Sequence, residues 1–322
     1  MLHNLACLQP TPDNLIYPPN RGDYTYFEGL RHIPGRSFLV NAAWAMDASM
    51  LAYARYGRTR MTEEELSAIL HDAGFTNVDT FGDNFVDNAC TARGFFASND
   101  ERGLLVFRGT EGDDPNDKEA DFDFVFVEDD GTRVERGFYR YIQTVWWYVS
   151  RLVAAYRRDH PTQEICVTGH SLGGALANLA FAYLRDPATS LYTFGCPRVG
   201  DRAFCGRIEA AARTQQCYRF IDNQDVVTHV PTNVPVFFPY EHPKTSLVWF
   251  DANGKMTTDE PDAPSDWAEF ARVIFGYMHG HILDSLPNPL PLPLADHSPV
   301  RYCHWIGEAL QNRAPQNENP QA

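Results

Sequence analysis

The feature that most constrains this chain is a run of glycines around one serine, between an apolar segment and a segment rich in alanine and leucine. Residues 165–168 read Ile-Cys-Val-Thr, which is typical of a buried strand, and the residues up to Leu184 predict a helix. Between them lies Gly169-His170-Ser171-Leu172-Gly173-Gly174. A sharp strand-to-helix elbow pushes a serine hydroxyl outward, while glycines let strand and helix pass closely. The pattern predicts a nucleophile at Ser171, and the alternative is a serine that only caps the helix.

Strand and helix patterns alternate through the middle of the chain. Strands are predicted at 77–81, 91–97, 103–108, 165–168, 191–194 and 218–221. Helices are predicted at 38–56, from 62 onward, at 137–158 and at 201–213. This order predicts an α/β fold with a mostly parallel central sheet and helices on both faces.

The two ends of the chain differ in composition from its middle. Residues 1–36 are rich in Pro, Asn and Gly and predict an extended N-terminal arm, and 311–322 predict a disordered tail. Residues 37–310 are expected to form a single domain. Within it, Ser246–Phe250 and the Asn253-Gly254 turn predict a hairpin, 267–283 a helix, and the proline-rich 287–293 an extended loop.

Charge and cysteine content exclude several classes of partner. Acidic residues outnumber basic ones by 42 to 27, a net charge of −15, which argues against binding nucleic acid. The seven cysteines stand singly without zinc-like spacing, so no metal is expected and at least one thiol is free. No apolar run is long enough to span a membrane, and residues 1–10 have neither the basic segment nor the apolar segment that is typical of a secretory signal. The default expectation is a cytoplasmic protein without an integral membrane segment, with export by a route that needs no leader left open.

Several further motifs occur in a fixed order, and together they resemble one family. They are Val106-Phe107-Arg108-Gly109-Thr110, Gly137-Phe138, the elbow from Val167 to Ala177, Thr193 to Gly200, Asn223 to Pro231, and Asp296-His297-Ser298 followed by Tyr302. In this order they resemble the class 3 lipases, the fungal-lipase-like α/β-hydrolases, over roughly residues 100–305. The resemblance implies an α/β-hydrolase fold.

The resemblance also implies a role for each candidate site residue. Ser171 is the nucleophile, His297 the base and Asp225 the acid that orients the imidazole, in the chain order of α/β-hydrolases. The backbone N–H groups of Leu172 and Thr110 form the oxyanion hole. For Asp225 the alternative is a turn-capping role, and for Thr110 it is a residue that merely ends a strand.

The choice of histidine is less direct, because the chain has 11. His297 is favoured by its loop position before a final helix, 72 positions after Asp225, and His281 is the next candidate. The other local rivals are His170, His229, His279 and His304.

The chain departs from the family pattern in two places. Residues 111–120, where the family often has an amphipathic lid, are almost wholly polar, so interfacial activation through this segment is doubtful. Glu135 stands where the family frequently has a histidine. An apolar loop, 286–294, precedes His297, and its Leu290, Leu292 and Leu294 either line an acyl-chain site or pack on the core.

These observations predict a serine carboxylic-ester hydrolase, a lipase or esterase of the class 3 type, that cleaves glycerolipid esters through an acyl-enzyme without a cofactor. The expected partner is a lipid or other acyl ester, with transient contact to a lipid interface. One alternative is a phospholipase A1, including an exported lipid-degrading effector. The other is a lipase-like binding module without catalysis.

Overall fold

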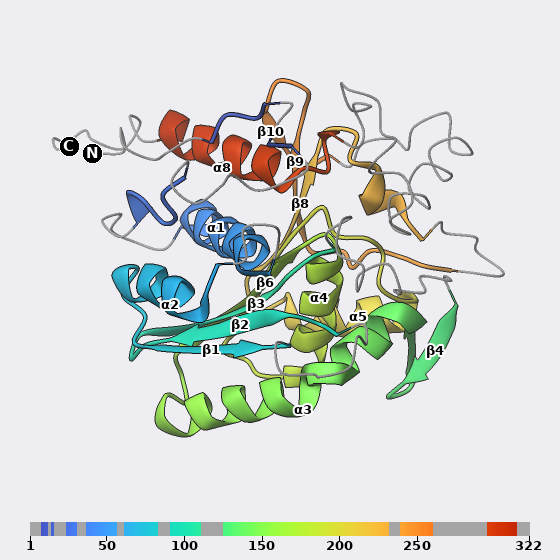
Figure 1. Cartoon of the computed structure of the whole chain (residues 1–322). Helices are drawn as coiled ribbons and strands as arrows, with labels where there is room; N and C mark the ends of the chain where they lie inside the picture. Colours follow the sequence, from blue (N-terminus) through green and yellow to red (C-terminus); the bar gives the residue numbers. More distant parts are fainter. Residues whose placement is uncertain are drawn as a thin grey trace, which may run out of the picture.

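An eight-stranded sheet forms the centre of the molecule, in the order β1-β2-β3-β6-β7-β8-β9-β10 (Figure 1). The computed structural model describes residues 8–11, 14–15, 24–30, 37–56, 61–82, 91–110, 125–231, 239–259 and 295–313. The strands are β1 (Asn77–Phe81), β2 (Gly94–Ser98), β3 (Arg102–Phe107), β6 (Glu164–His170), β7 (Thr189–Phe194), β8 (Cys217–Asp222), β9 (Ser246–Phe250) and β10 (Met256–Thr257).

The middle of this sheet is parallel and its two edges are antiparallel. Strands β3, β6, β7, β8 and β9 run parallel, whereas β1-β2-β3 and β9-β10 are antiparallel. Strand β7 is buried at every residue, as expected for a parallel strand covered on both faces. The predicted fold, a mostly parallel α/β-hydrolase sheet with helices on both faces, is confirmed.

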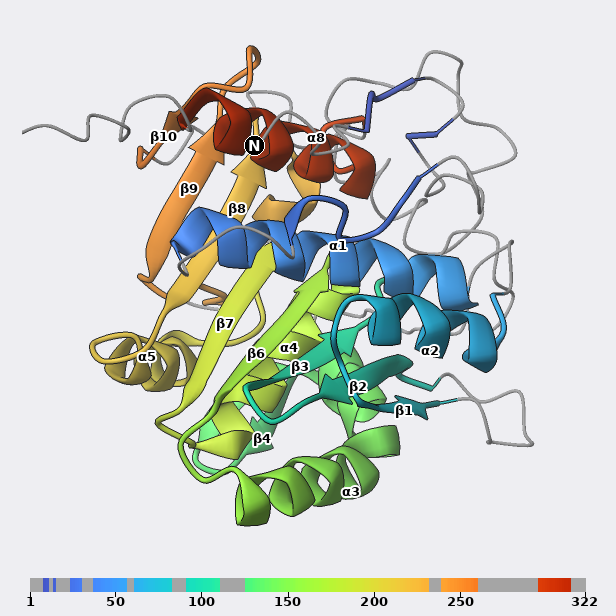
Figure 2. The same ribbon diagram turned by 90° about the vertical axis from the view of Figure 1, so that its left-hand side faces the viewer.

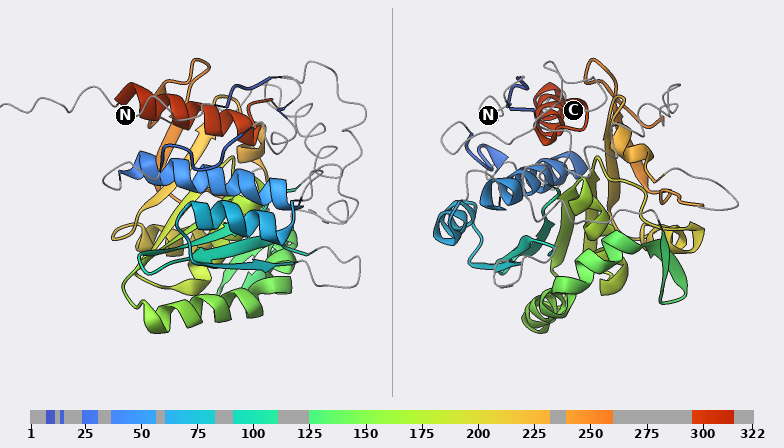
Figure 3. Two further views of the ribbon diagram at one scale, coloured as in Figure 1. Left: turned by 60° about the vertical axis from the view of Figure 1, so that its left-hand side comes forward. Right: turned by 45° about the vertical axis from the view of Figure 1, so that its right-hand side comes forward.

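Helices cover both faces of the sheet (Figures 2 and 3). They are α1 (Phe38–Tyr56), α2 (Glu63–Asp72), α3 (Arg136–Asp159), α4 (Leu172–Leu184), α5 (Arg202–Ala211) and α8 (Pro299–Arg313). Helices α1, α2 and α8 share one apolar core with one face of the sheet, and α3, α4 and α5 share a second core with the other face. The strand ends that carry candidate site residues therefore lie between the two layers of helices.

Local sequence sets several of these boundaries. Thr62 begins α2 with a capping box, because its side chain accepts from the Glu65 N–H and the Glu65 side chain accepts from the Thr62 N–H. Helix α8 continues to Arg313, three residues into the segment predicted as a tail. The hairpin of β4 (Phe126–Asp129) and β5 (Thr132–Glu135) has no counterpart in the sequence prediction.

The described part of the predicted arm packs against α1. Tyr26, Phe27 and Leu30 are buried, and the Phe27 ring stacks on Trp44 with centroids 4.8 Å apart. The carboxylate of Asp47 accepts hydrogen bonds from the Tyr24 hydroxyl at 2.5 Å and the Phe27 N–H at 2.7 Å. These contacts fix residues 24–30 onto the domain.

Candidate active site

Ser171 sits in the sharp turn that joins β6 to α4. Its backbone φ of 58° and ψ of −128° lie outside the regions that ordinary residues favour, so the turn is strained. Glycine makes the turn possible: a Cβ on Gly169 would overlap the backbone of Gly173, and one on Gly173 would overlap the Phe107 carbonyl oxygen of β3. The Ser171 N–H donates to the Phe194 carbonyl at 2.9 Å, which ties the elbow to β7.

The structure brings Ser171, His297 and Asp225 into one line of contacts. His297 Nε2 lies 2.8 Å from Ser171 Oγ, and His297 Nδ1 lies 2.9 and 3.0 Å from the two carboxylate oxygens of Asp225. Asp225 is wholly buried and His297 is 4% exposed, so water does not compete for these bonds. A proton on Nδ1 that is donated to Asp225 leaves Nε2 as the acceptor for the serine hydroxyl.

Asp225 is itself held by two donors. It follows β8 and begins the short helix η3 (Val226–His229), where its Oδ1 accepts from the Val227 N–H at 2.9 Å. Its Oδ2 accepts from the Tyr302 hydroxyl of α8 at 2.6 Å. Burial, followed by the Asp225 charge, raises the pKa of Tyr302 well above its ordinary value, so this hydroxyl keeps its proton and donates.

A glycine at the end of β7 leaves room for the aspartate and histidine side chains. Gly195 has a φ of 55°, and a Cβ there would lie 2.8 Å from Asp225 Oδ2 and 3.0 Å from His297 Nδ1. A side chain at this position would push the carboxylate and the imidazole apart.

His170, another histidine considered in the sequence, contacts the backbone of His297. Its Nε2 lies 2.8 Å from the His297 carbonyl oxygen, and its Nδ1 lies 2.9 Å from the Tyr53 hydroxyl of α1. Burial, followed by the His297 charge, lowers the pKa of His170 well below its usual value, so the ring is neutral. His229 ends η3 and His304 lies in α8, whereas His279 and His281 lie outside the described residues.

The two predicted oxyanion donors lie on neighbouring segments. Leu172 is the first residue of α4, where a backbone N–H has no partner within the helix. Strand β3 pairs with β6 so that Phe107 faces Gly169, and Thr110 and Leu172 each lie three residues beyond this pair. A Cβ on Gly109 would lie 2.7 Å from the His170 carbonyl oxygen, so the Thr110 segment runs directly beside the elbow.

The remaining residues that the sequence singles out are not part of these contacts. Leu290, Leu292 and Leu294 and the polar segment 111–120 lie outside the described residues. Glu135, the departure from the family pattern, begins α3, where its carboxylate accepts from the Phe138 N–H at 2.8 Å. Within the described ranges, no cluster of three or more His, Cys, Asp or Glu side chains is arranged to bind a metal ion.

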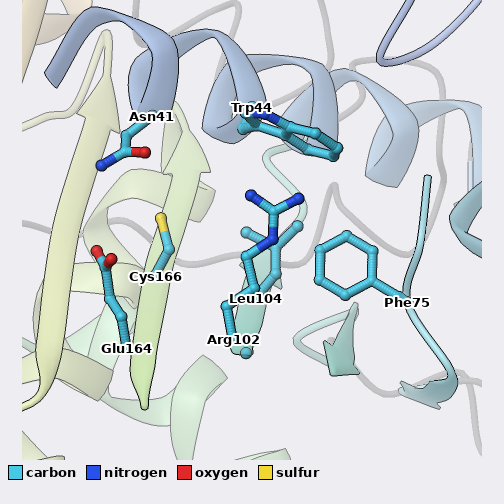
Figure 4. Close-up of a pocket in the computed structure, with 8 residues that line it drawn as sticks. Asn41, Trp44, Phe75, Arg102, Leu104, Glu164 and Cys166 are labelled. Carbon is cyan, nitrogen blue, oxygen red and sulfur yellow. The ribbon is translucent and has the colours of Figure 1, made fainter. Parts of the chain in front are cut away.

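A small pocket lies at the opposite end of the sheet, where β3 and β6 begin (Figure 4). The Arg102 guanidinium lies 4.0 Å from the centre of the Trp44 ring and 5.2 Å from that of Phe75, with Glu164 and Cys166 on the next strand. The cavity of about 30 Å³ has room for water but not for an acyl chain.

Sequence reasoning missed four residues that lie against Asp225 and His297 or contact the residues beside them. Gly195 and Asp296 belong to motifs that were recognised, so their positions were available although their roles were not. Tyr53 carries no local signal, because only the packing of α1 brings it beside His170, and the role of Arg301 depends on its contact with the distant Asp222.

Comparisons with known proteins show that the chain is similar to lipases. Residues 104–234 match the family described as Lipase (class 3). The chain is 37% identical over 123 residues to Secreted mono- and diacylglycerol lipase 1 of Fusarium solani, covering 38% of this chain and 35% of that protein. It is 38% identical over 109 residues to Toxin TseL of Vibrio cholerae, covering 32% and 15% respectively. The solved triacylglyceride lipase of Rhizomucor miehei superposes with a TM-score of 0.54 at 25% identity, over 81% of this chain and 98% of that one.

The matched segments span about a third or less of the length of these two curated relatives. The cytoplasmic location expected from the sequence is wrong, because the relatives include a protein named as secreted and a toxin, which point to an extracellular location. None of the described helices is long and apolar enough to cross a membrane.

Proposed function

The chain is a member of the class 3 lipase family, as the match over residues 104–234 shows, and from this premise we propose that it hydrolyses lipid carboxylic esters through an acyl-serine intermediate. The observation that carries the proposal is the contact series from Asp225 to His297 at 2.9 Å and from His297 to Ser171 at 2.8 Å. Both distances lie within the range that a nucleophile, its base and the group that orients the base require.

The proposed reaction proceeds in two halves. Ser171 Oγ attacks the ester carbonyl carbon while His297 Nε2 takes the hydroxyl proton, and Asp225 stabilises the imidazolium that forms. When the tetrahedral intermediate collapses, the imidazolium gives its proton to the leaving alcohol and the acyl group stays on Ser171. Water then attacks the acyl-serine with His297 again as base, which releases the acid and restores the hydroxyl.

The negative charge on the carbonyl oxygen forms beside the start of α4. We assign its stabilisation to the N–H groups of Leu172 and Thr110, which the pairing of β3 with β6 carries to the same edge of the sheet. One such donor typically lowers the barrier by about 3 kcal/mol. The positive end of the helix dipole adds to this effect.

We propose acylglycerols as the substrate class, because two of the similar proteins are named for mono-, di- or triacylglyceride hydrolysis. The net charge of −15 favours a neutral or zwitterionic lipid interface over an anionic one during transient contact. The likeness to a toxin supports a second role, as an exported effector that degrades lipids outside the producing cell.

The test is hydrolysis of p-nitrophenyl esters from two to sixteen carbons, followed by acylglycerols and phosphatidylcholine in mixed micelles. We expect Ser171→Ala and His297→Ala each to lower kcat/KM by about 10⁴-fold or more, because either change removes proton transfer to and from the nucleophile. His71→Ala, an exposed histidine in α2, is the matched control and keeps full activity.

Covalent labelling gives a second measurement. A fluorophosphonate probe should modify the native protein on Ser171, as peptide mass spectrometry would detect, and should leave Ser171→Ala unlabelled. A native protein that is neither labelled nor active on any of these esters would contradict the proposal and favour a non-catalytic binding module.

A further inference from the structure

A buried charged cluster lies beside the histidine and aspartate, and the mechanism above does not use it. Asp222 ends β8, Asp296 directly precedes His297, and Arg301 lies in the first turns of α8. Both carboxylates are wholly buried, and the Arg301 side chain is 16% exposed. Charged groups are rarely buried in this way unless they are paired, so their contacts need an account.

One guanidinium joins the two carboxylates. Arg301 Nε donates to Asp222 Oδ2 at 2.7 Å, and Arg301 Nη2 lies 2.9 Å from Asp296 Oδ1. The planar fork of arginine allows both contacts at once, which a single ammonium group does not reproduce. The cluster thus links the end of β8 to the segment that carries His297.

The second oxygen of Asp296 reaches the loop that carries Asp225. Asp296 Oδ2 accepts from the Asn223 side-chain amide at 2.9 Å and from the Gln224 N–H at 3.1 Å. Gln224 immediately precedes Asp225, and Asp296 immediately precedes His297. The Asp296 carboxylate therefore links the residue before Asp225 to the residue before His297. Asp225 and His297 are themselves in contact at 2.9 Å.

Stability alone does not account for this cluster. Burial raises the pKa of Asp222 to about 7 although the Arg301 hydrogen bond lowers it, so two carboxylates and one arginine are costly to hold here. Buried ion pairs often contribute no more to stability than apolar residues of similar size. What the cluster provides is a fixed relative position for two loops that are 72 residues apart in the chain.

We infer that Asp296 and Arg301 are positioning residues that hold His297 in register with Asp225. The inference rests on the proposed hydrolase function. Neither residue contacts the reacting atoms, so both act through the imidazole: when the clamp is lost, His297 aligns less often with Ser171, while substrate binding is unaffected.

The first experiment separates the fork of Arg301 from its charge. We expect Arg301→Lys, which keeps the charge but loses the double contact, to lower kcat for p-nitrophenyl butyrate about tenfold while KM stays within about twofold. Fluorophosphonate labelling of Ser171 should slow by a similar factor. The control is Arg202→Lys, which alters an exposed ion pair with Glu209 in α5 and leaves kcat unchanged.

The second experiment is a double-mutant cycle with kcat as the readout. Asp296→Asn removes the ion pair but retains the shape of the side chain, so we expect a loss of about tenfold on its own. Because both residues belong to one clamp, the double variant Asp296→Asn with Arg301→Lys should lose far less than the hundredfold expected for independent sites.

The inference would be overturned by native kcat in both single variants, by losses that multiply, or by a rise in KM that accounts for the whole effect. A native protein that is inactive and unlabelled contradicts the hydrolase proposal instead. A variant that loses activity together with its cooperative unfolding transition contradicts the positioning role, because the cluster then serves folding alone.

Discussion

The two sides of the candidate site are held in place by different kinds of contact. The Ser171 side is made of backbone: Gly169 and Gly173 let β6, α4 and β3 approach so closely that a Cβ at either position would overlap main-chain atoms. The His297 side is made of side chains, where buried hydrogen bonds and ion pairs from Arg301 and Tyr302 hold the residues around Asp225.

This difference predicts different responses to substitution. Main-chain atoms in a sheet cannot move individually to make room for an added side chain. Substitutions at the elbow should therefore have severe effects that do not depend on pH. A polar network loses its contacts one by one and contains groups that titrate. Changes near α8 should therefore be graded and should depend on pH.

The largest effect is expected at the elbow, in Gly173→Ala. The added methyl group would overlap the Phe107 carbonyl oxygen and lie 2.9 Å from the Arg108 carbonyl carbon, and both are backbone atoms. We expect the free energy of unfolding in urea to fall by more than about 3 kcal/mol, and activity to fall with it, because α4 must shift away from β3.

Gly206→Ala is the matched control, since a Cβ at this position in α5 would meet nothing within 4 Å. It should be neutral or stabilise the protein by about 0.5 to 1 kcal/mol, because alanine favours the helix. Equal stability of the two variants would show that the elbow is not held by close backbone packing.

The same contrast explains what the sequence could predict. The parallel strands, the helices on both faces and the elbow follow from patterns that span fewer than about twenty residues, and these predictions agree with the structure. The hairpin of β4 and β5 was missed because its strands have four residues each and are only partly apolar. Local composition did not distinguish these strands from a loop.

The polar side of the site was predictable only where a motif included it. The resemblance predicts roles for Asp225 and His297, whereas the role of Arg301 depends on a contact with Asp222, 79 positions away. Tyr53 and His170 lie 117 positions apart. No periodicity encodes such pairs, because their proximity results from the packing of α1 and α8 on the completed sheet.

Asp47 connects α1 to α8, and its contribution to stability should depend on pH. Asp47 in α1 accepts from Tyr24 and also from Cys303 of α8 at 3.5 Å, and burial raises its pKa from 3.8 to about 6. The folded chain thus binds this proton more tightly than the unfolded chain. The resulting stabilisation is complete below pH 3.8 and is lost as the pH rises through 6, an amount of about 3 kcal/mol.

Urea unfolding of the native protein and of Asp47→Asn between pH 3.5 and 7 measures this contribution. The stability advantage of the native protein over the variant should shrink by about 3 kcal/mol as the pH rises through this range. Gly206→Ala, which changes no titrating group, should give a difference that is independent of pH. A constant difference for Asp47→Asn would mean that its carboxyl does not titrate in this range in the folded protein.

The smallest effect is expected for Tyr302→Phe, which removes one hydroxyl from the polar side. This hydroxyl donates to Asp225 Oδ2 at 2.6 Å and accepts from the Asp222 N–H at 3.0 Å. A hydrogen bond to a charged group contributes about 1.5 to 3 kcal/mol, so we expect a stability loss of about 2 kcal/mol and a kcat about tenfold lower. Tyr156→Phe is the control, because its hydroxyl donates to the neutral Asn99 carbonyl oxygen, away from the site. It should lose about 1 kcal/mol of stability and no activity. If Tyr302→Phe kept native kcat, the side-chain network would stabilise the fold without orienting Asp225, and the contrast between the two sides would concern stability alone.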